Sequence, residues 1–148
     1  MAQKAKVHPM GLNERISAGV IAITILVFGW YFLDIMAMTA DARPTVAEFG
    51  PTLWLMMGFY VVLVIIVTIL AAVMSKKDKE MYDERDDLID LRSERVASYV
   101  QGGLLFGLLI LVMFEYSLFI IAHAILGIMV IYTLIGFGMR LYYYRRNV

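Results

Sequence analysis

Two ionisable side chains lie inside long apolar stretches of the sequence, and a third lies at the edge of one. They are Asp34, His123 and Glu115. Such groups are costly at membrane depth and by default mark a candidate functional site. If the apolar stretches are helices, the three groups lie at about one level. An imidazole between two carboxylates would suit a proton site or a cation site. The competing interpretation is a hydrogen-bonded Asp34–His123 pair that only fixes helix packing.

Methionines offer a second candidate chemistry, because thioethers together with an imidazole suit Cu(I). Five of them fall in the outer halves of the predicted helices: Met36, Met38, Met56, Met57 and Met113. Methionine is also a flexible filler of apolar interiors, and the sequence has no M-x-x-M or H-x-x-M spacing. We therefore expect these residues to pack, with no metal site and no cofactor.

Signatures of an enzyme are missing from the sequence. It has no cysteine, no glycine-rich phosphate loop, no nucleophile elbow and no H-E-x-x-H. A single histidine at membrane depth excludes bis-histidine haem within one copy. The basic residues are few and mixed with acids, which argues against nucleic acid as a partner. We expect a protein that is not an enzyme.

Hydropathy defines the elements that must position these side chains. The chain is 61% hydrophobic and its mean hydropathy is +0.77. A helix needs roughly 20 apolar residues to cross a bilayer core, and four segments reach about that length: 17–39, 52–74, 97–116 and 118–138. Lipid offers no hydrogen-bond partners, so these segments must be helices or a closed barrel, and they lack the alternation of strands. The sequence predicts one all-α membrane domain, 1–148, of four transmembrane helices in two hairpins, with tails at 1–12 and 139–148.

The basic residues predict the orientation of this domain. Every Lys and Arg except Arg43 falls before the first helix, in 75–96, or at the C-terminus. The positive-inside tendency then places both termini and 75–96 in the cytoplasm. On the other side, Thr45 and Glu48 match a capping box for one short helical turn, which we expect Gly50 and Pro51 to break.

The segment 75–96 holds more than half of the Asp, Glu, Lys and Arg residues. It has no Gly or Pro, so helix three is predicted to extend through it into the cytoplasm. On a helical wheel an acidic stripe faces away from Arg85 and Arg92, and like charges one turn apart weaken an isolated helix. One hypothesis is self-association, with the acidic stripe of one copy against the arginines of the next; the other is a solvated helix. The predicted interaction surface consists of Asp83, Arg85, Asp87, Asp90, Arg92 and Glu94.

Further along this helix, Gly103 and Gly107 have the spacing that allows close helix approach. At its start, Asp83-Glu84-Arg85-Asp86, followed by Ile89, resembles a D-E-R-[DE] motif found in uncharacterised small bacterial inner-membrane proteins with four predicted helices. The resemblance covers about residues 80–105. It implies a multi-pass protein of the bacterial inner membrane, and it implies no activity.

Three functions follow as hypotheses. The first is a non-enzymatic integral membrane protein that acts by assembly through the charged helix, with itself or as an accessory subunit of a larger membrane complex. The second is a small oligomeric ion or proton channel or transporter that uses Asp34, Glu115 and His123. The third is a membrane protein that binds copper or a cofactor at the level of the outer methionines.

Overall fold

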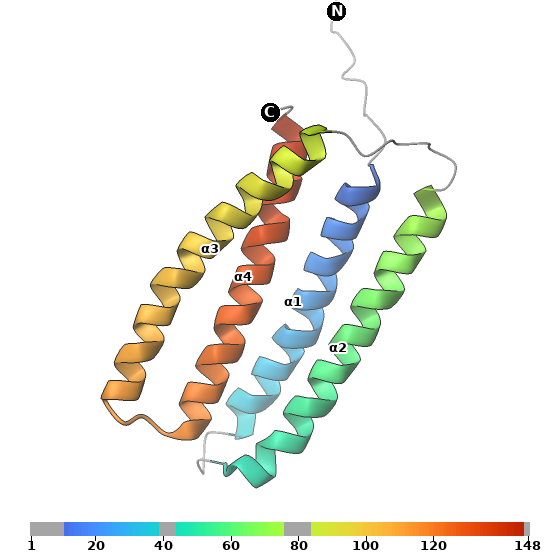
Figure 1. The fold of residues 1–148 in the computed structure, drawn as a ribbon. Coiled ribbons are helices and arrows are strands. Elements are labelled where there is room, and N and C mark those ends of the chain that lie inside the picture. The colour runs from blue at the N-terminus through green and yellow to red at the C-terminus, as the bar shows by residue number, and fades with distance from the viewer. Residues whose placement is uncertain (1–10, 39–43, 76–83, 147–148) are drawn as a thin grey trace, which may run out of the picture.

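The computed structural model describes residues 11–38, 44–75 and 84–146. They form the helices α1 (Leu12–Met38), α2 (Val46–Ser75), α3 (Glu84–Met113) and α4 (Leu118–Arg146) (Figure 1). All four are long and apolar enough to cross a membrane. The expected all-α, multi-pass membrane architecture is confirmed at this level. The part of the predicted long helix three that precedes Glu84 lies outside the described residues.

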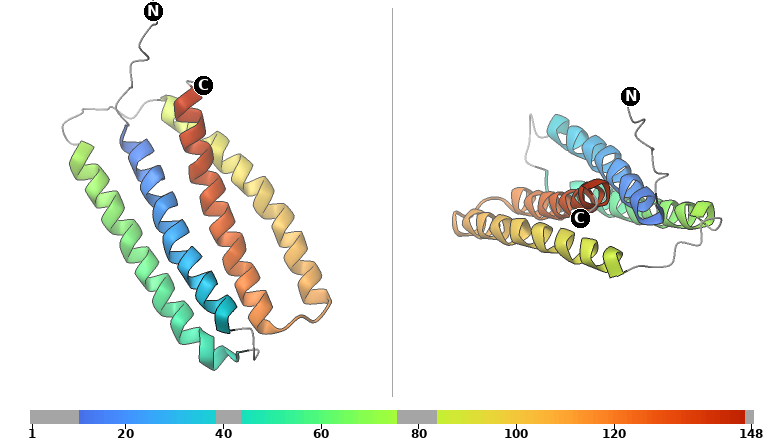
Figure 2. Two further views of the ribbon diagram at one scale, coloured as in Figure 1. Left: turned by 180° about the vertical axis from the view of Figure 1, so that it is seen from behind. Right: turned by 90° about the horizontal axis from the view of Figure 1, so that it is seen from above.

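The helices stand in an open row rather than around a common axis (Figures 1 and 2). Extensive contacts join α3 to α4, α4 to α1, and α1 to α2. The spatial order is therefore α3, α4, α1, α2, with α2 and α3 at the edges. We call the end of the row at residues 114–117 the turn end. The opposite end, where Asp86 and Arg140 lie, is the polar end.

The core of the row lies where α1 meets α2 and α4. Its buried residues are Val27, Phe28, Tyr31, Ile35, Met56 and Leu126. Towards the polar end, Thr24 of α1 is fully buried and its Oγ1 lies 3.0 Å from the Tyr60 hydroxyl of α2. Gly19 allows α1 and α2 to approach closely, since a Cβ there would lie 2.5 Å from Val67 Cγ1. A small residue on α1 thus seats a branched one on α2.

Helix α2 begins earlier than the sequence pattern indicated. The Glu48 carboxylate accepts hydrogen bonds from the backbone N–H and the hydroxyl of Thr45, at 2.6 and 3.0 Å. This capping arrangement starts a helix that continues through Pro51 to Ser75, so the expected break at Gly50 and Pro51 does not occur. Pro51 lies inside the helix, where proline removes one backbone hydrogen bond and crowds the carbonyl four residues before it, and the first turns of α2 bend (Figure 1).

A tight turn joins α3 to α4. The backbone N–H of Tyr116 donates to the Leu111 carbonyl at 3.1 Å, and that of Glu115 to Val112 at 3.0 Å. Glu115 has a φ of 54°, a left-handed position where helices usually end on glycine. The chain therefore reverses within residues 114–117, and α4 returns directly alongside α3.

Candidate functional site

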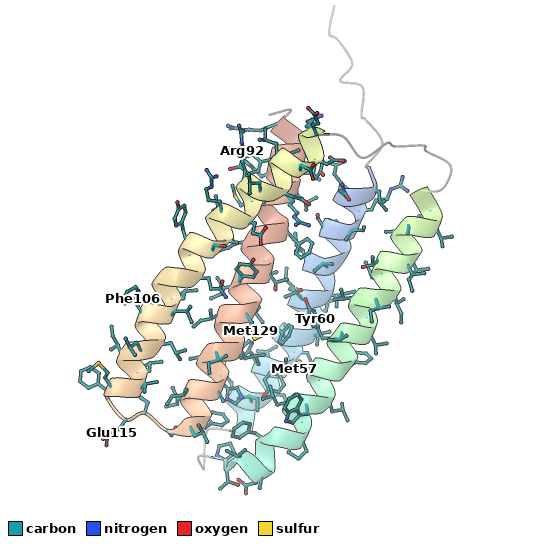
Figure 3. The ribbon with its side chains drawn as sticks, in the orientation of Figure 1. Met57, Tyr60, Arg92, Phe106, Glu115 and Met129 are labelled. Carbon is teal, nitrogen blue, oxygen red and sulfur yellow. The ribbon has the colours of Figure 1, made fainter. Side chains whose placement is uncertain are left out.

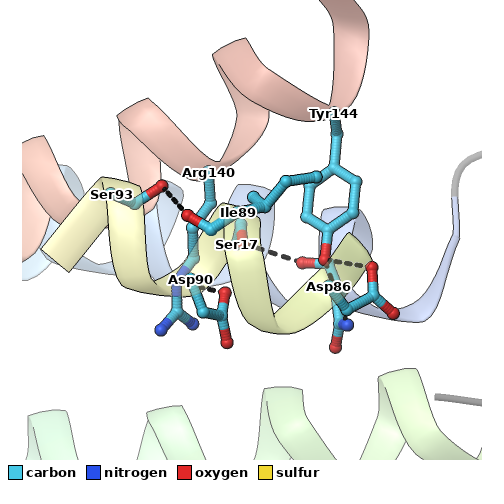
Figure 4. Close-up of polar contacts among 8 residues, drawn as sticks. Ser17, Asp86, Ile89, Asp90, Ser93, Arg140 and Tyr144 are labelled. Carbon is cyan, nitrogen blue, oxygen red and sulfur yellow. Dashed lines mark hydrogen bonds and ion pairs between the residues drawn. The ribbon is translucent and has the colours of Figure 1, made fainter. Parts of the chain in front are cut away.

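A polar network ties three helices together at the polar end (Figure 4). The Tyr144 hydroxyl of α4 donates to Asp86 Oδ1 of α3 at 2.8 Å, and accepts from Asn13 Nδ2 of α1 at 3.2 Å. One turn away, Arg140 Nε lies 3.0 Å from Asp90 Oδ1, and about a third of each side chain is exposed. Hydrogen bonds and an ion pair thus fix how far α1, α3 and α4 are shifted along their axes relative to one another.

Helical spacing explains why these groups meet. Asp86 and Asp90 lie four residues apart on α3, and Arg140 and Tyr144 lie four apart on α4, so each pair shares one face of its helix. On α3 the same side carries Ile89, which is buried against the rest of the chain. The countercharge of Asp90 therefore comes from this chain, whereas the sequence left open whether it would come from a second copy.

A half-open pocket of about 130 Å³ lies next to this network, between α3 and α4. Glu94 and Arg140 line it as charged groups, and Tyr132, Thr133 and Phe137 of α4 also face it. The Arg140 guanidinium lies over the Phe137 ring, 5.0 Å from its centroid. The pocket thus combines a carboxylate, a guanidinium and aromatic surface in one space.

Of the other charged residues that the sequence singled out, Glu94 lines this pocket, and the rest of those described lie on the outside of the row. Arg85, Asp87, Arg92 and Glu94 are exposed, and Asp83 lies outside the described residues. The two arginines begin a line of exposed side chains, each seven residues after the last, along the side of α3 that faces away from α4. We call this line the outer stripe; it consists of Arg85, Arg92, Tyr99, Phe106 and Met113.

Gly103 and Gly107 lie beside the outer stripe. A Cβ added at either position would meet no other atom within 4 Å, apart from the helix's own nearby backbone. The two glycines therefore do not serve helix packing within the described part of the chain. The backbone at these two glycines is therefore accessible to lipid or to another helix beside α3.

His123 takes a different partner from the one expected. Its Nδ1 lies 2.7 Å from the Phe119 carbonyl, and its Nε2 lies 2.9 Å from the hydroxyl of Tyr31, which is buried on α1. A carbonyl can only accept, so Nδ1 carries a hydrogen; in the tautomer with its single hydrogen on Nδ1, Nε2 accepts the Tyr31 hydrogen. The Tyr31 ring is parallel to the imidazole, and the rings of Phe49 and Phe119 also pack on it. The residue is held in an aromatic cage between α1, α2 and α4.

Neither candidate carboxylate is a hydrogen-bond partner of His123. Asp34 is half-buried one turn beyond Tyr31, and no hydrogen bond joins it to His123. Glu115 is exposed in the turn and points away from the helices (Figure 3). Within residues 11–38, 44–75 and 84–146, no three Asp, Glu or His side chains gather as a metal site would require.

The outer methionines also separate into two kinds. Met56 is buried in the core and Met57 packs against it, whereas Met36 and Met113 are exposed. The side chain of Met38 lies outside the described part of the structure.

Sequence reasoning missed Tyr31, Asn13, Arg140 and Tyr144. Tyr31 falls inside the predicted helix 17–39, and Arg140 and Tyr144 fall in 139–148, which was predicted only as a tail. A signal for the last two was present: a short turn between α3 and α4 places residues equally far from it side by side. Asp90 lies 23 residues before Met113 and Arg140 lies 22 after Leu118, so the two fall within one residue of the same level.

The fold and the polar end define a multi-pass α-helical membrane protein with a polar network at one end of its helix row. No protein-family model, curated protein or solved structure matches the chain. What the protein does must therefore be argued from its own geometry.

Proposed function

We propose that this protein is a non-enzymatic integral membrane protein that acts by assembly through α3. It associates either with further copies of itself or, as a small accessory subunit, with a larger membrane complex. The observation that carries this proposal is the position of α3 at the edge of the row. It packs extensively only on α4, and its outer stripe is exposed from end to end.

Exposed apolar side chains alone do not argue for assembly, because lipid covers them as well as protein does. The glycines do. Gly103 and Gly107 lie open beside Tyr99 and Phe106, and small residues in membrane helices are enriched where two backbones approach closely. The seven-residue spacing of the stripe is also the spacing at which side chains of two helices interdigitate. The membrane part of α3 thus has both features of a helix-packing face.

The start of α3 supplies the polar part of the same surface. Arg92 of the outer stripe is exposed there, whereas Asp87 is exposed on another side of the helix, so the stripe suits a partner that carries a carboxylate. Exposed pairs of this kind contribute less than about 1 kcal/mol each. These charges would therefore determine which partner binds and in which register, while close packing at Gly103 and Gly107 would supply most of the binding energy.

We also propose the orientation and location that the charges predicted. The polar end would face the cytoplasm of a bacterial cell from its inner membrane, with both termini on that side and the first turns of α3 projecting beyond the bilayer. Support comes from Arg140, Arg145 and Arg146, which end α4 at the polar end. The contacts of α1 with α2 and of α3 with α4 fit two hairpins.

Native mass spectrometry of the protein released gently from membranes tests the assembly. We expect a defined homo-oligomer or a complex with one larger protein, and Gly107→Leu should release the single chain. Gly58→Leu on α2 is the matched control, because a Cβ there also meets nothing within 4 Å. A lone chain in the wild type, or an assembly that Gly107→Leu leaves intact, would contradict the proposal.

A channel or transporter remains the alternative, with support from one observation. Asp34 is half-buried next to the Tyr31–His123 pair, so two titratable groups lie near one another at the turn end. Proton or cation flux in liposomes that Asp34→Asn abolishes would favour this function over assembly alone.

A further inference from the structure

The pocket between α3 and α4 lies at the depth where lipid headgroups begin. Arg140 follows Leu118, the first residue of α4 at the turn end, by about 33 Å at 1.5 Å per residue. Along α3, Glu94 lies about 28 Å from Met113 by the same measure. The hydrocarbon core of a bilayer is about 30 Å thick. If the turn end marks one face of that core, both charged side chains lie at the other.

The charged side chains that line the pocket suit a ligand that carries both a positive and a negative charge. Arg140 directs its Nε at Asp90, and a guanidinium has four further N–H donors in a geometry that matches phosphate. Among the described residues no ion pair joins Glu94 to Arg140. The Glu94 carboxylate therefore suits a ligand ammonium, and together with Asp90 it disfavours a ligand that is only anionic.

The remaining walls suit the apolar continuation of a lipid. Tyr132 lies about 12 Å deeper along α4 than Arg140, so the pocket runs from the charged level into the hydrocarbon region. Gly136 supplies no side chain there and faces Ala97 across the two helices, where its Cβ would lie 3.8 Å from that of Ala97. Two small residues thus leave the space of about 130 Å³ between larger ones.

We propose that this pocket binds the headgroup of a zwitterionic phospholipid, with the phosphate at Arg140 and a primary ammonium at Glu94. The lipid's glycerol and acyl chains would leave past Tyr132 along the exposed apolar surface of the row. This inference does not depend on assembly, since all its residues come from one chain.

Native mass spectrometry with added lipid tests the proposal on the purified full chain. Phosphatidylethanolamine and phosphatidylglycerol with identical acyl chains are titrated separately, and the occupancy of the first bound lipid is measured. We expect phosphatidylethanolamine to bind more tightly by up to about fivefold, the upper end for one partly exposed charge contact. Glu94→Gln should remove that preference. Glu84→Gln is the matched control, because it makes the same substitution on an exposed residue of α3 that does not line the pocket, and it should preserve the preference.

Equal binding of the two lipids, or a preference that survives Glu94→Gln, would overturn the proposal. A competition with soluble phosphoethanolamine distinguishes the source of the headgroup. Retention of the bound lipid in a large excess of the soluble compound is the expected result. Displacement would assign the pocket to a small soluble zwitterion and overturn the assignment to lipid.

Discussion

Removing the Tyr31 hydroxyl measures how firmly α1 and α4 are joined. Tyr31→Phe keeps the ring in its buried place and deletes only the group that lies 2.9 Å from His123 Nε2. The imidazole is fixed by its other nitrogen, which donates to the Phe119 carbonyl, so Nε2 is left without its donor. Hydrogen bonds between membrane helices contribute about 0.6 kcal/mol on average and up to about 1.7 kcal/mol. We expect a loss of about 1 kcal/mol, because this bond lies in an aromatic, water-poor cage.

A double-mutant cycle isolates this contribution. The free energy of unfolding is measured by SDS titration from mixed micelles for the wild type, Tyr31→Phe, His123→Phe and the double variant. The coupling should fall between about 0.5 and 1.7 kcal/mol. Tyr116→Phe removes a hydroxyl from an exposed tyrosine of the turn and should change stability by less than about 0.5 kcal/mol. A coupling within error of zero would refute the reasoning, as would a nitrogen-15 spectrum in which Nε2 of His123 carries the hydrogen.

Two further predictions concern the other helix contacts. Gly19→Leu should lower the free energy of unfolding, measured by the same titration, by about 1–3 kcal/mol through overpacking against Val67. Gly29→Leu is the control and should have little effect, because a Cβ at Gly29 meets no atom within 4 Å. Equal losses for the two variants would contradict the close approach of α1 and α2. Asp90→Asn and Arg140→Gln should each destabilise the protein, with a coupling of about 0.2–1 kcal/mol that shrinks at high salt; a coupling that high salt leaves unchanged would show that charge does not hold α3 on α4.

The sequence predicted the four apolar helices because membrane helices are governed by the surrounding lipid. Length and hydropathy suffice for that, and neither requires knowledge of which helix contacts which. The order of the row could not be obtained in this way. It depends on small local fits, such as Gly19 against Val67, and hydropathy does not distinguish a face that meets lipid from one that meets another helix.

The same limit applies to the candidate sites. Asp34 and His123 were paired because charged groups at membrane depth seek partners, and that reasoning considered only ionisable residues. The partner of His123 is Tyr31, a side chain with one polar atom on a large apolar ring, so its sequence signal is that of a packing residue. For Asp90, the wheel of a single helix could name like-charged neighbours only. Its partner Arg140 lies on another helix and can be identified only from the packing of α4 against α3.

The order of the helices in space has a consequence for how the protein is made. Helix α4 is synthesised last, yet it lies inside the row, between α3 and α1. The row therefore cannot grow by adding each new helix at an outer edge as it leaves the ribosome. Until α4 is inserted, α3 lacks the neighbour that buries Ile89 and Ala97, and Asn13 and Tyr31 of α1 lack their hydrogen-bond acceptors, Tyr144 and His123. Insertion of α4 is thus the step that joins α3 to the earlier pair, α1 and α2. A chain that stopped before Leu118 would leave α3 in the bilayer without the helix on which it packs.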